Sequence, residues 1–95
     1  MSNKIEVFSF ANIAATPASF VLRGGNYGLT VSAIFGGGSV TLQRLSPDGS
    51  TYVTVITALT AAGYASANLP NGTYRLLIAT ATAVYADVVS IATPL

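Results

Sequence analysis

The chain contains no cysteine and no histidine, and its only carboxylate side chains are Glu6, Asp48 and Asp87. Thiolate and imidazole groups are the usual zinc ligands and the commonest catalytic nucleophiles and bases, so such sites have nothing to be built from. The three carboxylates are far apart in sequence and do not form the clustered oxygens of a calcium loop. We therefore expect no enzymatic activity, no catalytic residue, no metal and no cofactor.

Charge is also scarce. Only 7% of the residues are charged, against an average of about 25%, whereas 52% are hydrophobic. A domain of 95 residues leaves roughly a third of its surface exposed on folding, so much of its exterior must be uncharged. Such a surface is suited to burial against other protein molecules. The basic residues are scattered and predict no nucleic-acid partner; they are Lys4, Arg23, Arg44 and Arg75.

Membrane insertion and export are not expected either. The longest apolar run, residues 76–92, is shorter than the ~20 residues of a transmembrane helix, and it contains Asp87. Glu6 lies where a secretory signal would need an unbroken apolar segment. We therefore expect no membrane partner and a protein made without Sec export.

A turn at Pro47, Asp48 and Gly49 is the clearest structural motif. Proline fixes φ at the first central position of a type I turn, aspartate tolerates the second, and glycine supplies the positive φ at which the next strand leaves. Alternating residues flank this turn from 36 to 56. The sequence therefore predicts a β-hairpin, with Val40 and Leu42 on one face and polar residues on the other.

A second turn follows Leu69 at Pro70, Asn71 and Gly72. Tyr74 lies just beyond it, where two interpretations are open. The tyrosine hydroxyl could bond back to upstream backbone, as in the tyrosine corner of Greek-key sandwiches, or the motif could be a plain hairpin turn.

Strand-like alternation recurs along the chain, and the turns have the spacing expected of a sandwich. The sequence predicts an all-β fold, an antiparallel β-sandwich of about seven strands with an Ig-like or jelly-roll-like Greek key, over residues 17–95. Residues 1–16 are expected to form an N-terminal arm on a neighbouring subunit or an edge strand. Segments 74–78 and 83–91 are expected to pair as a hairpin, with Asp87 either solvated or paired with Arg75.

The five tyrosines are the remaining candidates for recognition. Tyr27 and Tyr74 are in phase with the apolar face and are expected in the core, whereas Tyr52 and Tyr85 are out of phase and are expected on the surface. Exposed tyrosines can stack on sugar rings or anchor a protein partner.

Several segments resemble small proteins of tailed-bacteriophage virions, of the capsid decoration or cement kind. The segments are Gly-Gly-x-Tyr-x-Leu-x-Val at 24–31, Phe-Gly-Gly-Gly-Ser-Val-Thr-Leu-Gln at 35–43, Pro-Asp-Gly-Ser-Thr at 47–51, Leu-Thr-Ala-Ala-Gly at 59–63 and Leu-Pro-x-Gly-x-Tyr-Arg at 69–75. The similarity spans about residues 20–91. It implies a β-sandwich on the outer face of an icosahedral head, assembled in the host cytoplasm, commonly as a trimer, which bridges neighbouring copies of the major capsid protein.

The expected function is therefore a virion structural protein that decorates or cements a phage capsid as a homo-oligomer. The predicted protein-contact residues belong mainly to the polar face of the hairpin; they are Thr41, Gln43, Tyr52, Thr54 and, outside the hairpin, Tyr85. The alternative is a head- or tail-fibre module that binds host-surface carbohydrate through Tyr52, Tyr85 and Arg44.

Overall fold

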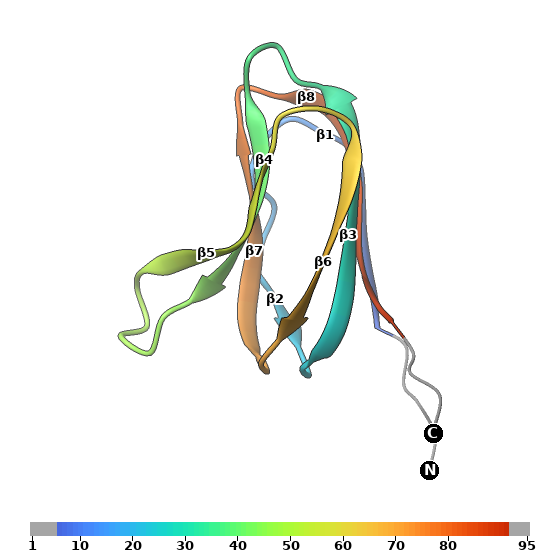
Figure 1. Ribbon diagram of the computed structural model, residues 1–95. Helices are drawn as coiled ribbons and strands as arrows, with labels where there is room; N and C mark the ends of the chain where they lie inside the picture. Colours follow the sequence, from blue (N-terminus) through green and yellow to red (C-terminus); the bar gives the residue numbers. More distant parts are fainter. Residues whose placement is uncertain (1–5, 92–95) are drawn as a thin grey trace.

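In the computed structural model, the described residues 6–91 form eight β-strands and no helix. The strands are β1 (Val7–Ile13), β2 (Phe20–Leu22), β3 (Gly25–Ile34), β4 (Ser39–Leu45), β5 (Tyr52–Leu59), β6 (Gly63–Leu69), β7 (Gly72–Ala79) and β8 (Thr82–Ser90). They build two four-stranded antiparallel sheets that face each other (Figure 1). The predicted all-β sandwich is confirmed, but it has eight strands where about seven were predicted. Of the alternatives for the first residues, Val7–Ile13 forms an edge strand; residues 1–5 lie outside the described part.

The strand order shows that the fold is one long hairpin rolled up on itself. Sheet A has the order β1-β8-β3-β6, and sheet B has the order β2-β7-β4-β5. The first strand pairs with the last, the second with the seventh, the third with the sixth and the fourth with the fifth. Paired residues lie almost equally far from Asp48 in sequence: Val7 with Val89, Phe20 with Tyr74, Gly25 with Leu69, and Leu45 with Tyr52. This nested pairing is the eight-stranded jelly roll.

The predicted turn lies at the centre of that long hairpin and has the predicted geometry. The Gly49 N–H donates to the Ser46 carbonyl at 2.9 Å, which closes a turn with Pro47 and Asp48 at its centre. Gly49 has φ of 78°, and the Ser46 N–H then bonds to the Thr51 carbonyl at 2.7 Å. The β4–β5 hairpin is therefore confirmed.

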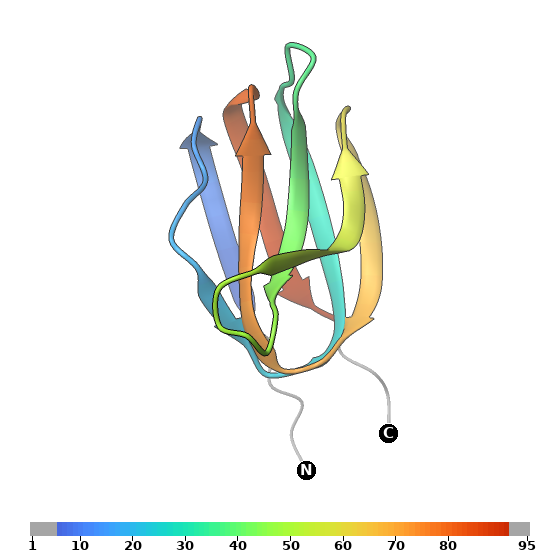
Figure 2. The same ribbon diagram turned by 90° about the vertical axis from the view of Figure 1, so that its left-hand side faces the viewer.

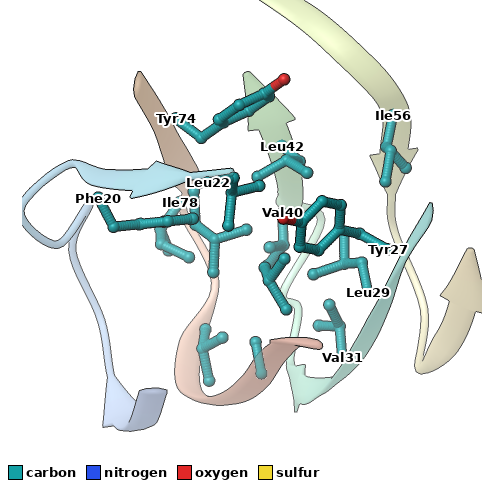
Figure 3. Close-up of a cluster of buried hydrophobic side chains, with 14 of the residues drawn as sticks. Phe20, Leu22, Tyr27, Leu29, Val31, Val40, Leu42, Ile56, Tyr74 and Ile78 are labelled. Atoms are coloured by element: carbon teal, nitrogen blue, oxygen red, sulfur yellow. The ribbon is translucent and has the colours of Figure 1, made fainter. Parts of the chain in front are cut away.

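The core lies between the two sheets and contains alternate, inward-facing residues of the strands in both sheets (Figure 3). Val40 and Leu42 of β4 are fully buried, as predicted, and so are Tyr27 and Tyr74 to within 1%. Burial of an aliphatic side chain such as that of Val40 or Leu42 stabilises the fold by about 1.5–3 kcal/mol relative to exposure. The other buried apolar residues are Phe20, Leu22, Leu29, Val31, Ile56, Leu69, Leu76, Ile78, Ala81, Val84, Ala86 and Val88.

Aromatic rings join the two sheets at the β1–β2 side of the sandwich. The Phe8 and Phe20 rings stack at 4.9 Å between centroids, and Phe10 meets Phe20 at 5.7 Å. Because β2 is short, it pairs only with the first part of β7. The Ile78 N–H of β7 beyond that point is satisfied by the Thr16 hydroxyl at 3.1 Å.

In the C-terminal half, one prediction is wrong and one open alternative is decided. β7 and β8 do not form a hairpin, because β7 belongs to sheet B and β8 to sheet A. The connection from Leu69 to Gly72 likewise crosses from sheet A to sheet B, so it is not a plain hairpin turn. The Tyr74 hydroxyl donates to the Pro70 carbonyl at 2.5 Å, which is the bond of a tyrosine corner.

Gly38 lies where two crossings between the sheets touch. Its N–H bonds to the Phe35 carbonyl at 2.7 Å, and a Cβ added to it would lie 1.9 Å from the Ala79 carbonyl oxygen. Side chains cannot approach backbone so closely. The three glycines at 36–38 thus include one that the contact between the β3–β4 and β7–β8 crossings requires.

We expect Gly38→Ala to destabilise the protein by about 3 kcal/mol, the upper part of the range for overpacking, because the backbone of one crossing must move. Chemical denaturation of both proteins measures this difference. Gly36→Ala is the matched control: its φ is 55° but an added Cβ meets nothing within 4 Å, so a smaller loss of about 1 kcal/mol is expected. Equal losses in the two variants would contradict the close approach.

We expect Tyr74→Phe to lower the free energy of unfolding by about 1 kcal/mol near neutral pH, because the bond to Pro70 is lost. Burial raises the pKa of Tyr74 above 10.0, although the nearby charge of Arg44 lowers it. The stabilisation is therefore complete below pH 10 and is lost as the pH rises through the higher folded-state value.

Denaturation curves of wild type and Tyr74→Phe, measured from neutral to alkaline pH, should accordingly converge above about pH 10. Tyr64→Phe is the control, since Tyr64 is 60% exposed and should tolerate loss of its hydroxyl within about 0.5 kcal/mol. A constant difference between wild type and Tyr74→Phe at all pH values would be inconsistent with the corner bond.

Candidate functional site: the outer faces of the two sheets

Four of the five predicted contact residues lie together on the outer side of sheet B. Thr41 and Gln43 come from β4, and Tyr52 and Thr54 come from β5, where Gln43 and Thr54 are paired across the strands. Tyr85 is separate, because it projects from β8 on the outer face of sheet A. The structure therefore places the predicted residues on two faces of the sandwich.

Arg75 of β7 connects the sheet B residues into one cluster. Its Nε donates to the Gln43 Oε1 at 2.9 Å, and its guanidinium carbon lies 4.0 Å from the centre of the Tyr52 ring. The Gln43 amide in turn reaches the Thr54 hydroxyl at 3.5 Å. A stacked guanidinium with a fixed amide partner is held rigidly, which is how interface residues avoid losing entropy on binding.

The first part of β5 covers this cluster. Figure 2 shows this segment crossing in front of β4 and β7 before the strand climbs beside β6. The pairing of β4 with β5 shifts at Leu42, where the chain changes direction. As a result Thr41 and Gln43 are only 6% and 9% exposed. The predicted contact residues Thr41 and Gln43 are thus covered by the chain itself, whereas Thr54 and the adjacent Val53 are exposed.

Nearly all of the charged side chains in residues 6–91 are engaged by groups of the chain itself. The Glu6 carboxylate accepts the Tyr27 hydroxyl and the Arg23 N–H, and it lies 3.8 Å from the Arg23 Nε. Burial raises the pKa of Tyr27, and the bond to Glu6 acts in the same direction. Arg44 donates to the Asn71 carbonyl at 2.9 Å.

Asp48 is engaged inside its own turn. One carboxylate oxygen accepts the Ser50 and Thr51 N–H groups at 2.9 Å each, and the other accepts the Thr51 hydroxyl at 2.8 Å. These bonds lower the pKa of Asp48 from 3.8 to about 2. Asp87 is the exception: within residues 6–91 its carboxylate has no hydrogen bond and no ion pair. Of the two alternatives for Asp87, pairing with Arg75 is wrong, because the two residues belong to different sheets.

Sheet A carries an open hollow of about 380 Å³ on its outer face, over β1, β8 and β3. It exists because the outward-facing residues of β1 and β3 are small here, whereas β8 contributes Tyr85 and Asp87. The small residues are Ser9, Ala11, Thr30 and Ser32, and backbone near Phe10 and Ala86 completes the lining. Tyr64 lies beside the hollow with its ring over Gly28, where an added Cβ would come within 2.6 Å of the phenol oxygen.

The three residues suggested as carbohydrate contacts do not share a site. Tyr52 and Arg44 belong to sheet B, and Tyr85 belongs to the outer face of sheet A. The part of the chain that the structure describes contains no group of three or more potential metal ligands among His, Cys, Asp and Glu. It also has no helix with the length and apolarity needed to cross a membrane.

No family model matches this chain, and the comparisons with curated proteins and with solved structures found no match.

Sequence reasoning found the hairpin face but missed the hollow and the Glu6–Tyr27 contact. Three pairs of residues that line the hollow are each two positions apart in sequence. They are Ser9 and Ala11, Thr30 and Ser32, and Tyr85 and Asp87. That spacing could have placed each pair on one face of a strand. It could not show that β8 lies between β1 and β3, because the last strand was expected to pair with β7.

Asp48→Ala should destabilise the protein at neutral pH and have a smaller effect as the pH approaches 2. The folded-state pKa of about 2 lies below 3.8, so the ionised carboxylate stabilises the fold above pH 3.8 and this contribution disappears as the pH falls to 2. Thermal unfolding of both proteins between pH 7 and pH 2 measures the effect. Ser50→Ala keeps the backbone donor to Asp48 and is the matched control, with no pH-dependent difference expected. A difference for Asp48→Ala that stays constant with pH would count against the turn bonds.

Proposed function

We propose that the protein is a structural component of a tailed-phage virion that decorates or cements the capsid as a homo-oligomer, with the trimer as the favoured state. One observation carries the proposal: in residues 6–91 five of the six charged side chains are held by partners within the chain. The outer faces therefore offer neighbours apolar and hydroxyl groups with little free charge to desolvate. The sequence resemblance supports the same function.

The apolar groups on this surface are spread over both faces. The exposed large ones are Val7, Val21, Ile34, Val53, Tyr64, Tyr85 and Ile91. A protein that stayed free in solution would gain from charges at such positions. Contact of sheet B with capsid protein would instead cover those on that sheet, Val21 and Val53. The jelly roll is compatible with this role, since capsid domains are among the proteins that use it, but the same fold also serves lectins.

The outer face of sheet B is our proposed surface for the major capsid protein. Val53 is 52% exposed in the first part of β5, between Tyr52 and Thr54, which contact Arg75 and Gln43 of the rigid cluster. Each such contact would be weak. An oligomer that engages several capsid subunits at once gains avidity, so cementing needs no single tight site.

The fibre-module alternative is less well supported in its original form, because its three proposed sugar contacts are on different sheets. A glycan contact at sheet B would also have to use Tyr52, whose ring already covers Arg75.

Purified particles of the source phage should contain this chain in a fixed ratio to the major capsid protein, which quantitative mass spectrometry measures. Recombinant chain added to particles that lack it should sediment with them. Val53→Lys should weaken this binding about tenfold or more, because an unpaired charge would be buried at the contact.

Ile34→Lys is the matched control, since Ile34 is a 66% exposed aliphatic residue on sheet A, and it should bind particles as wild type does. If the reverse pattern is found, the contact is on sheet A. A chain that stays monomeric and never sediments with particles would refute the proposed function.

A further inference from the structure

We infer that the hollow on the outer face of sheet A binds a neutral pyranose sugar. The hollow has about 380 Å³, at the lower end of the ~300–1,000 Å³ typical of small-molecule sites. It lies on regular strands, because Ser9, Asp87 and Thr30 are direct neighbours in the pairing of β1, β8 and β3. The groups that line it are therefore held by the backbone of a four-stranded sheet.

The polar side chains of the hollow have unused bonding capacity. Within residues 6–91, the Asp87 carboxylate and the hydroxyls of Ser9, Thr30 and Ser32 make no side-chain hydrogen bond. This contrasts with the carboxylates of Glu6 and Asp48, which accept several bonds each. A ligand at this position would therefore meet one carboxylate and three hydroxyls that make no side-chain hydrogen bond to residues 6–91.

The donor and acceptor types match those of a sugar. A carboxylate only accepts hydrogen bonds, and its two oxygens can take the protons of two neighbouring ring hydroxyls. Serine and threonine hydroxyls both donate and accept, as sugar hydroxyls do. Tyr85 is 52% exposed and stands two residues from Asp87 on the same side of β8, where its ring can cover the C–H face of a pyranose.

The charges favour a neutral ligand over an anionic one. Among residues 6–91, no basic side chain lines the hollow, and the only charged one there is Asp87. An acidic sugar would be repelled by that carboxylate. An ammonium group could donate to Asp87 and to hydroxyl oxygens, but it accepts no hydrogen bond, so the three hydroxyls could not donate to it. A polyol both donates and accepts and can use all four groups.

This inference does not depend on the proposed capsid role. The hollow is on sheet A, and the proposed capsid contact is on sheet B. A particle-bound copy would therefore keep the hollow free, and either proposal can fail while the other holds.

The test is a titration of ¹⁵N-labelled full-length protein with methyl glycosides of glucose, galactose, mannose and N-acetylglucosamine, followed by amide chemical shifts. We expect at least one glycoside to shift the amides around Ser9, Thr30 and Asp87. Asp87→Asn and Tyr85→Ala should each weaken that binding about tenfold or more, as expected for loss of a charged hydrogen bond or a stacking ring. Both changes are at the surface, and thermal unfolding will show whether the variants remain folded.

Val53→Ala is the control, because it removes an exposed apolar side chain from sheet B, away from the hollow, and it should bind as wild type does. Methylammonium and glucuronic acid are the charged probes. The inference is overturned if no glycoside shifts these amides at high millimolar concentration, if the shifts lie elsewhere, or if only a charged probe binds. A glycan array then distinguishes a free monosaccharide from the terminal sugar of a longer chain.

Discussion

The nested pairing of strands about a single turn is the constraint on which the rest of this structure depends. The turn at Ser46–Thr51 sets the register of β4 against β5. Each strand pair farther from the turn in sequence is then placed symmetrically around it. Rolling this ladder into two sheets brings residues far apart in sequence together, such as Val7 and Val89. It also sends each crossing between the sheets over one end of the core, which is why Gly38 and the Tyr74 corner occur where they do.

The same rolling separates the molecule into two outer faces with different properties. On sheet B the Arg75 side chain is held between Gln43 and Tyr52, beneath the first part of β5. On sheet A the small residues of β1 and β3 leave Asp87 and Tyr85 standing in a hollow. A scarcity of charge over the whole sequence thus becomes, in three dimensions, one face whose arginine is held by neighbouring side chains and another with a carboxylate that no described residue engages.

The sequence was most informative where structure is local. The turn chemistry of Pro47, Asp48 and Gly49 and the alternation around it sufficed for the central hairpin, and phase alone placed Tyr27 and Tyr74 in the core. It failed for pairing between distant strands, because adjacent segments that look like a hairpin can belong to different sheets, as β7 and β8 do. The exposure of the candidate site could not be predicted for the same reason. Alternation placed Thr41 and Gln43 on the polar face, but only the bend of β5 determines that they are covered.

The pairing of the first strand with the last has a consequence for how the protein forms. During synthesis β1 is the first of the eight strands to be made, whereas its hydrogen-bonding partner β8 is the last of the eight. Sheet A therefore cannot be completed until all eight strands are available, and until then β3 also lacks one of its two neighbours. Such long-range closure is slow in comparison with local contacts, so the time of assembly is set by the final strand. A chain of this composition would be most vulnerable to aggregation during that interval, when its uncharged strand edges are still unpaired.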